Sequence, residues 1–326
     1  MTISSVSLLS QQFVMEWKHK GSLPVQMNSL HIVRIGNTVY CGGGFTCKVS
    51  TDRLVLKYDC EEDKWSQLPI CPTLHFGLTQ LDEKLVTVGG RDSDALTPIK
   101  DMYIFEEDSQ TWKNSNEPLS TARCSPCAFA YKSVLVACGG IVSWRFDYDH
   151  PVRTDSVEVF QDSQWHASVP IPFALCFMSC AVVNDTCYII GGLKQGGLLN
   201  QQVCFTSTPS LIQTDLPESS SEASSSSHTW ERHNCPLFFS TAAELEGHLL
   251  AIGGKDKNNT PSSAIHRYLP SSKSWEIIAN GALPKPKYHA AAVRLEGDII
   301  VVGGKDKPGI NIRSMDKSVY IGSKPN

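Results

Sequence analysis

The chain has 326 residues, of which 41% are hydrophobic and 19% charged, and its formal net charge is −4. This composition is typical of a folded globular protein. The small negative charge argues against nucleic acid or an anionic membrane as a partner, and no apolar run reaches the roughly 18 residues of a membrane span. Residues 1–12 lack the basic flank and apolar core of a signal peptide, so we expect a cytoplasmic protein.

Six short apolar runs recur along the chain, and each ends in a pair of glycines. The pairs are Gly42-Gly43, Gly89-Gly90, Gly139-Gly140, Gly191-Gly192, Gly253-Gly254 and Gly303-Gly304. From the second glycine of each pair the steps are 47, 50, 52, 62 and 50 residues. A period near 50 residues is the signature of a repeat architecture. Six repeats use nearly the whole sequence, so we expect one domain over residues 1–326.

Each repeat is predicted to form four strands, a to d, with strand a innermost. A short polar turn precedes each glycine-ended run, as at Gly36-Asn37 and Asn184-Asp185. Turns of two or three residues between apolar runs predict hairpins. Strand a is small and apolar, as in residues 127–131, which suits a crowded axis.

Tryptophans give the repeats a second common feature. They follow most glycine pairs by about 20 to 25 residues, at Trp65, Trp112, Trp165 and Trp275, with Trp230 later in a longer repeat. This pattern resembles the Kelch repeat, in which each repeat forms one four-stranded blade of a β-propeller. The resemblance covers essentially the whole chain and implies an all-β, six-bladed Kelch-type propeller. It also implies that each glycine pair packs near the aromatic residues of strands c and d.

The last repeat lacks a fourth strand. Residues 313–321 can supply strand c, but nothing after them can supply strand d. The N-terminal residues 12–20 can, and they carry the otherwise unassigned Trp17. We therefore expect the N-terminal strand to complete blade six and close the ring, because an open propeller would leave long unpaired edges.

The fourth repeat carries a serine-rich insertion, residues 217–228, which is expected to be disordered between strands c and d. Two interpretations remain for it, a tolerated insertion or a phosphorylated regulatory loop.

Twelve cysteines do not predict a disulfide scaffold in a long chain without a secretory signal. Cys41, Cys138 and Cys187 lie inside apolar runs, where cysteine acts as a small hydrophobic residue. Cys124 and Cys127 have the C-x-x-C spacing, but no second pair follows at the distance of a zinc site.

No motif for nucleophilic, phosphate-binding or zinc chemistry is present. Glu158, Asp162 and His166 fit the spacing associated with iron in the plant specifier proteins, which are also Kelch propellers. They are predicted on the outer strands c and d, so they should not converge in the axial cavity. The sequence therefore predicts no catalytic residue, no metal and no cofactor.

The b–c and d–a connections are expected to form one broad face around the channel, the loop face. Residues 141–154 of blade three fall on it and carry three aromatic side chains and an arginine, at Trp144, Arg145, Phe146 and Tyr148. Aromatic residues and arginine are enriched at the energetic centres of protein interfaces. These residues either contact a partner or fold beneath the loop and fix its conformation.

Seven lysines are also predicted on this face in blades four to six: Lys194, Lys255, Lys257, Lys285, Lys287, Lys305 and Lys307. Two aspartates, Asp256 and Asp306, offset them, which leaves a net charge of +5 in this sector. Arg91 and Arg123 extend the basic character to blades two and three. The cluster would steer an acidic or phosphorylated segment toward the face; the alternative is a solvated lysine rim.

We therefore expect a monomeric, non-catalytic module that binds an acidic segment of a protein partner. The resemblance also implies substrate recognition for a cullin-RING ubiquitin ligase, as in BTB–Kelch adaptors, although no BTB or BACK region accompanies these repeats. The alternatives are an actin-associated or other scaffold propeller and, more distantly, a metal-dependent enzyme.

Overall fold

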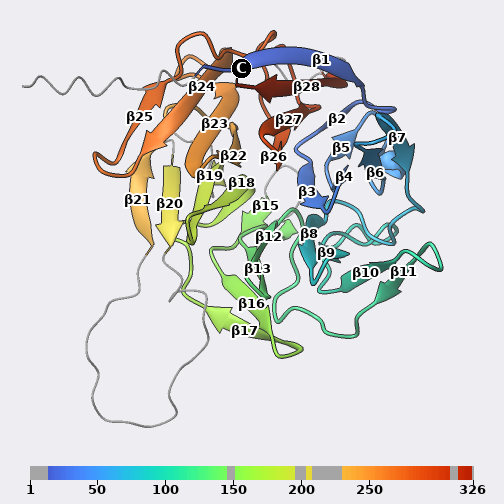
Figure 1. The fold of residues 1–326 in the computed structure, drawn as a ribbon. Coiled ribbons are helices and arrows are strands. Elements are labelled where there is room, and N and C mark those ends of the chain that lie inside the picture. Colours follow the sequence, from blue (N-terminus) through green and yellow to red (C-terminus); the bar gives the residue numbers. More distant parts are fainter. Residues whose placement is uncertain (1–13, 145–150, 195–202, 208–229, 309–314, 325–326) are drawn as a thin grey trace, which may run out of the picture.

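The computed structural model describes residues 14–144, 151–194, 203–207, 230–308 and 315–324. Within these residues the strands form six four-stranded antiparallel sheets. The innermost strands of neighbouring sheets contact one another in a closed ring, so the sheets are the blades of a propeller around a central axis (Figure 1). The sequence-based prediction of a six-bladed all-β propeller is confirmed.

The first three blades follow one another along the chain. Blade 1 consists of β3 (His31–Ile35), β4 (Thr38–Gly42), β6 (Val55–Asp59) and β7 (Lys64–Gln67). Blade 2 consists of β8 (Gly77–Leu81), β9 (Lys84–Val88), β10 (Met102–Glu106) and β11 (Thr111–Asn114). Blade 3 consists of β12 (Cys127–Tyr131), β13 (Val134–Cys138), β16 (Val157–Gln161) and β17 (Gln164–Ser168).

The remaining blades complete the circle. Blade 4 consists of β18 (Leu175–Val183), β19 (Thr186–Lys194), β20 (Val203–Ser207) and β21 (Glu231–Asn234). Blade 5 consists of β22 (Thr241–Leu245), β23 (His248–Lys255), β24 (Pro261–Leu269) and β25 (Ser274–Ile277). Blade 6 consists of β26 (Ala291–Leu295), β27 (Asp298–Val302), β28 (Ser318–Ser323) and β1 (Glu16–Ser22).

Two short strand pairs and one helical turn lie in the b–c and d–a connections. The short strands β2 (Met27–Asn28) and β5 (Phe45–Thr46) pair with each other, as do β14 (Ile141–Trp144) and β15 (Pro151–Arg153). A single 3-10 turn, η1 (Val49–Thr51), follows β5. Among the described residues no helix is long and apolar enough to cross a bilayer.

The N-terminal strand closes the ring. β1 pairs antiparallel with β28, from Glu16 opposite Ser323 to Ser22 opposite Ser318, and Figure 1 shows the two running side by side across blade 6. The indole nitrogen of Trp17 donates to the carbonyl oxygen of Gly281 at 2.8 Å. Closure by the N-terminal strand is therefore confirmed. The strand covers residues 16–22 instead of 12–20, and strand c begins at Ser318 instead of residue 313.

Other tryptophans connect neighbouring blades in the same way. The indole of Trp112 donates to the carbonyl of Pro69 at 2.8 Å, and Trp165 donates to Glu117 at 3.1 Å. Each acceptor lies in the segment that follows the preceding blade. Partial burial of the ring and one hydrogen bond thus fix each outer strand against the blade before it.

The glycine pairs contact the next blade rather than the tryptophans. The amide of Gly90 donates to the carbonyl of Arg123 at 2.8 Å, and a Cβ on Gly89 would lie 2.5 Å from that oxygen. Gly253-Gly254 and Lys287 repeat this arrangement, with 2.6 Å for the hydrogen bond and 2.4 Å for the Cβ approach. The repeat needs glycine there because a side chain would separate the blades.

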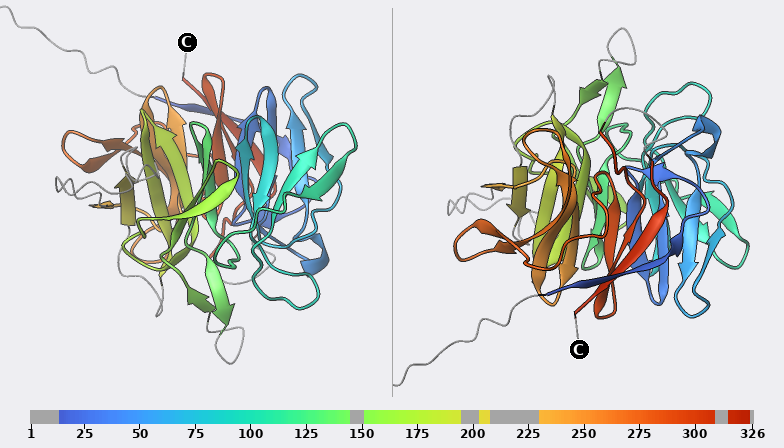
Figure 2. Two further views of the ribbon diagram at one scale, coloured as in Figure 1. Left: turned by 90° about the horizontal axis from the view of Figure 1, so that it is seen from below. Right: turned by 90° about the horizontal axis from the view of Figure 1, so that it is seen from above.

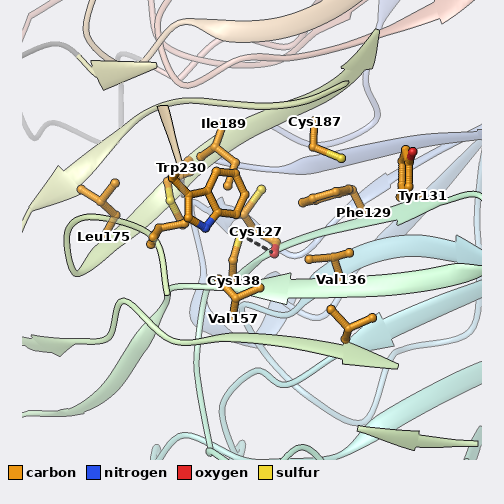
Figure 3. Packing of buried hydrophobic residues seen from close by; sticks show 13 residues of the cluster. Cys127, Phe129, Tyr131, Val136, Cys138, Val157, Leu175, Cys187, Ile189 and Trp230 are labelled. Carbon is orange, nitrogen blue, oxygen red and sulfur yellow. Dashed lines mark hydrogen bonds between the residues drawn. The ribbon is translucent and has the colours of Figure 1, made fainter. Parts of the chain in front are cut away.

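Apolar side chains fill the space between blades. Between blades 3 and 4, Trp230 and the thiols of Cys127, Cys138 and Cys187 pack with valine and isoleucine side chains from strands a to c (Figure 3). Cys41, Cys138 and Cys187 are almost fully buried, so the prediction that they act as small hydrophobic residues is confirmed. Burial raises the pKa of Cys124 to about 12, which disfavours the reactive thiolate. The serine-rich residues 217–228 lie outside the described residues.

Candidate functional site

The loop face lies at the end of the propeller where the glycine pairs end strand b. In each antiparallel blade the a–b and c–d turns lie at one end, so the b–c and d–a connections share the other end. One residue per repeat, just before or at the start of strand a, has positive φ between 49° and 56°. These six residues, which we call the mouth ring, are Ser29, His75, Ser125, Phe177, Phe239 and His289.

Backbone hydrogen bonds connect members of the mouth ring across blade boundaries. The amide of Ser29 donates to the carbonyl of His289 at 2.8 Å, and the amide of Ser125 donates to His75 at 2.7 Å. The amide of His289 donates to Phe239 at 3.0 Å. Left-handed backbone is uncommon for such residues, and its recurrence in every blade shows that the propeller geometry imposes it. Sequence reasoning missed this ring, although its members are spaced nearly as the glycine pairs are.

Aromatic side chains gather across the mouth of the channel. Phe45, from the b–c connection of blade 1, lies 4.3 Å from the ring of His75 and 5.6 Å from Phe177 of the opposite blade 4. The rings of Phe239 and His289 lie 4.2 Å apart. Together these rings occupy the centre of the mouth.

The channel beside the ring encloses little space. A cavity of about 70 Å³ is lined by Ser29, His31, Ser240, His289 and other residues at the start of each strand a. Since one water molecule takes about 30 Å³ of liquid volume, this space suits a few small molecules and not a peptide. The cavity itself is therefore too small to enclose a peptide.

Burial favours the neutral form of the histidines at the mouth. Burial lowers the pKa of His75 and of His31 to about 4, and burial together with the charges of Lys305 and Lys255 lowers the pKa of His289 to about 3. Burial raises the pKa of Asp52 to about 6, although the hydroxyl and amide of Thr46 donate to its carboxylate. The mouth is thus an environment in which charge is costly.

Arg123 is a structural residue and not an exposed binding residue, so its assignment to the partner-binding set was wrong. Its side chain is 0% exposed and forms an ion pair with Glu158. The guanidinium also donates to the carbonyl oxygens of Gly139 and Ser156, at 3.1 and 3.0 Å. It therefore connects the d–a segment to strands b and c of blade 3.

Lys287 has the equivalent role in blade 6, and its assignment to the exposed cluster was also wrong. The residue is 0% exposed, and Nζ donates to Gly303 and to the Asp316 carboxylate, both at 2.8 Å. Burial alone would raise the pKa of Asp316, but Lys287 and Ser318 hold it at about 2. A charge count along the sequence cannot separate such buried cations from surface ones.

Unlike those of Arg123 and Lys287, the side chains of Lys255 and Lys305 have no carboxylate partner among the described residues. Each directly follows a glycine pair, and their backbones pair with Phe238 and Tyr288. Lys255 is only 8% exposed, and its Nζ lies 4.1 Å from the centre of the Tyr288 ring. Burial lowers the pKa of both lysines, and the charge of Lys305 further lowers that of Lys255. Within the described residues neither side chain forms an ion pair.

The other predicted cations are distributed over the face. Lys257, Lys285 and Lys307 are exposed, whereas Lys255 is buried and Lys305 is half-buried. Lys194 lies 4.1 Å from the centre of the Phe173 ring, and Arg91 donates from Nε to the carbonyl of Leu96 at 2.8 Å. The structure thus brings the basic residues of blades 5 and 6 together, and leaves Lys194 and Arg91 engaged in their own blades.

The predicted aromatic loop of blade 3 is partly a β-ribbon. β14 and β15 pair with each other and extend beyond the ends of the blades, as Figure 2 shows in green. Arg145, Phe146 and Tyr148 lie outside the described residues, and Trp144 is the last residue of β14. Their contact with a partner remains a prediction.

The structure shows the surroundings of Glu158 and His166, two of the three residues whose spacing resembles an iron site. Both oxygens of the buried Glu158 carboxylate are engaged, since Ser120 and Thr121 donate backbone amides at 2.6 and 3.1 Å in addition to the Arg123 ion pair. His166 lies on strand β17, where it is paired with Val159. This carboxylate is therefore a structural acceptor in blade 3.

Comparison with known proteins identifies the family. The KLHDC2/KLHL20/DRC7 Kelch-repeats domain matches residues 75–304, which is well over half of the chain. The chain therefore belongs to the Kelch-repeat proteins, as its glycine pairs and tryptophans indicated.

Curated relatives and a solved structure agree with this assignment. Beta-scruin of Limulus polyphemus is 22% identical over 262 residues, covering 77% of this chain and 27% of its own length. Kelch-like protein 35 of Mus musculus is 25% identical over 246 residues, covering 72% of this chain and 36% of its own. The chain thus spans well under half of either relative. The structure of YjhT has the same fold, with a TM-score of 0.70 at 14% identity over 91% of this chain and 95% of that one.

Proposed function

We propose that this propeller is a non-catalytic protein-recognition module whose loop face binds an acidic or phosphorylated segment of a partner. The observation that carries the proposal is the collection of lysines from blades 5 and 6 on one rim, three exposed and two half-buried or buried, in a chain of net charge −4. A face of one sign raises the association rate and selects partners of the opposite sign. The projecting β14/β15 ribbon adds a second contact surface on the same face.

Affinity capture from cell lysate tests this proposal directly. The charge-reversal variant Lys257→Glu/Lys307→Glu changes two exposed lysines of the loop face. Its matched control, Lys84→Glu/Lys132→Glu, changes two exposed lysines at the a–b end, where their ion pairs with Glu106 and Asp185 are surface ones. We expect proteins captured by the wild type to be lost from the first variant and retained by the control. Equal capture by all three proteins contradicts the proposal.

A narrower role follows from the similarity to Kelch-like proteins. We propose that recognition serves a cullin-RING ubiquitin ligase in the cytoplasm, with the propeller acting as a monomer and without a cofactor. Recovery of a cullin among the captured proteins would support this role. Co-sedimentation with filamentous actin instead would favour the scaffold alternative.

A further inference from the structure

The pair Lys255 and Lys305 stands apart among the basic residues around the mouth. Buried charged groups in proteins are ordinarily paired, as Arg123 is with Glu158 and Lys287 with Asp316. Lys255 is also buried, at 8% exposed against 0% for Arg123 and Lys287, yet its Nζ lies over the face of the Tyr288 ring and forms no ion pair within the described residues. Two ammonium groups whose charges repel each other are thus held in a poorly hydrated position.

Neighbouring acids do not neutralise the pair. Asp256 follows Lys255 directly, but its Oδ1 accepts the backbone amides of Asn258 and Thr260, both at 2.9 Å, and so stabilises the β23–β24 turn. Asp306 follows Lys305, and its charge acts on Lys287, where it raises that pKa. Neither aspartate forms an ion pair with Lys255 or Lys305 within the described part of the chain.

The surroundings of the pair are rigid. Tyr288 is buried, its hydroxyl donates to the carbonyl of Lys307 at 3.0 Å, and its backbone forms two hydrogen bonds with Lys305, at 2.8 and 3.0 Å. The backbone of Lys255 forms two more with Phe238, at 2.7 and 2.8 Å. The backbone that carries both lysines is therefore ordered before a ligand binds, so little backbone freedom is lost on binding, which favours affinity.

We infer that Lys255, whose ammonium group lies over the Tyr288 ring, and Lys305, whose backbone pairs with Tyr288, form an oxyanion site that binds one carboxylate or phosphate group at the rim of the channel mouth. An anion between the two ammonium groups supplies the missing counter-charge and accepts charge-assisted hydrogen bonds from both. The inference deepens the proposed function, because it names the point at which an acidic segment would be anchored. The exposed Lys257, Lys285 and Lys307 then act as outer guides, whose contribution salt screens more strongly.

Inorganic phosphate and acetate are the probes for the test. The unfolding midpoint is followed as each anion is titrated at constant ionic strength, with chloride as the balancing ion. A ligand that binds the folded state alone raises the midpoint in a saturable way. We expect wild type and Lys257→Gln/Lys307→Gln to show saturable stabilisation, and Lys255→Gln/Lys305→Gln to lose at least four-fifths of it.

The two anions distinguish the source of the ligand. Stabilisation by phosphate alone assigns the site to a phosphorylated segment, and stabilisation by both assigns it to carboxylates as well. An unchanged response in Lys255→Gln/Lys305→Gln, or no saturable response in any protein, overturns the inference.

Failure of this site and failure of the proposed function give different results. Anion binding that depends on Lys255 and Lys305, with no partner captured from lysate, would leave the site in place and remove the recognition role. Capture that depends on Lys257 and Lys307 but not on Lys255 and Lys305 would keep the recognition role and remove the site.

Discussion

Two regions of this propeller use buried cations in opposite ways. At the seams within blades 3 and 6, Arg123 and Lys287 are fully buried and each meets a carboxylate and backbone carbonyl groups. On the rim of the loop face, Lys255 and Lys305 are partly desolvated and have no carboxylate partner among the residues that the structure describes. The first arrangement holds the fold together, whereas the second leaves charge available to a ligand. We expect the presence of a partner group, and not burial or charge alone, to separate structural cations from cations that can bind a ligand.

The largest expected effect is a loss of stability at acidic pH, which tests whether the histidines at the mouth are held in their neutral form. His31, His75 and His289 have folded-state pKa values below the unfolded value of 6.5. Their contribution to stability is therefore fully present above pH 6.5 and is lost as pH falls toward 4. Asp52, with its pKa raised to about 6, partly offsets the loss, because its contribution grows as pH falls through that value. We expect the free energy of unfolding to fall by roughly 4 kcal/mol between pH 7 and pH 5.

Urea titrations at the two pH values measure this change. The variant His75→Phe keeps a ring against Phe45 and removes one titrating group. The decrease in its free energy of unfolding between pH 7 and pH 5 should be smaller than that of wild type by about 2 kcal/mol. Identical pH dependence of the two proteins would show that His75 does not titrate as a buried neutral group.

The next largest effect tests the seam of blade 3. Arg123→Met should lower the free energy of unfolding by about 3 kcal/mol or more, because it leaves the Glu158 carboxylate buried without its counter-charge. The double variant Arg123→Met/Glu158→Leu should recover much of that loss, since no buried charge remains. Denaturant unfolding of the three proteins provides the double-mutant comparison. A loss below 1 kcal/mol in the single variant would place Arg123 among the weakly coupled cations.

A smaller effect tests the tryptophan links between blades. Trp112→Phe retains an aromatic ring against Phe105 but removes the hydrogen bond to the Pro69 carbonyl. We expect a loss of about 1 kcal/mol, the usual net value of one hydrogen bond. Trp275→Phe is the matched control, because the buried Trp275 indole nitrogen has no hydrogen-bond partner among the described residues. It should cost less than Trp112→Phe, and the reverse order would contradict the assigned role of the link.

The smallest effect tests the contrast between structural and unpaired cations, and it is expected to be a gain in stability instead of a loss. Lys255→Gln/Lys305→Gln removes two desolvated charges that repel each other, so it should leave the free energy of unfolding unchanged or raise it by up to about 1 kcal/mol. Thermal and urea unfolding without added phosphate measure this change. A loss of 2 kcal/mol or more would make these lysines structural, like Lys287.

Most of the fold was predictable because it depends on local patterns that repeat. The glycine pairs mark positions where the backbone closely approaches the next blade. The tryptophans mark positions where an aromatic ring packs between blades. The two-residue turns at Gly36-Asn37 and Asn184-Asp185 follow from the alternation of apolar runs with turn-forming residues. Even the closing strand could be placed, because a propeller with one strand missing from its last blade can complete it only from the other end of the chain.

The sequence by itself thus determined the propeller, its closure and the face on which its basic residues gather. Only the tertiary structure decided which cations are neutralised, because Arg123 meets Glu158, and Lys287 meets Asp316, through contacts between separate segments of a blade. It also brought Phe45, Phe177 and His289 from three different blades to one axis. Such convergence depends on the closed ring of six sheets, so no local pattern of residues encodes it.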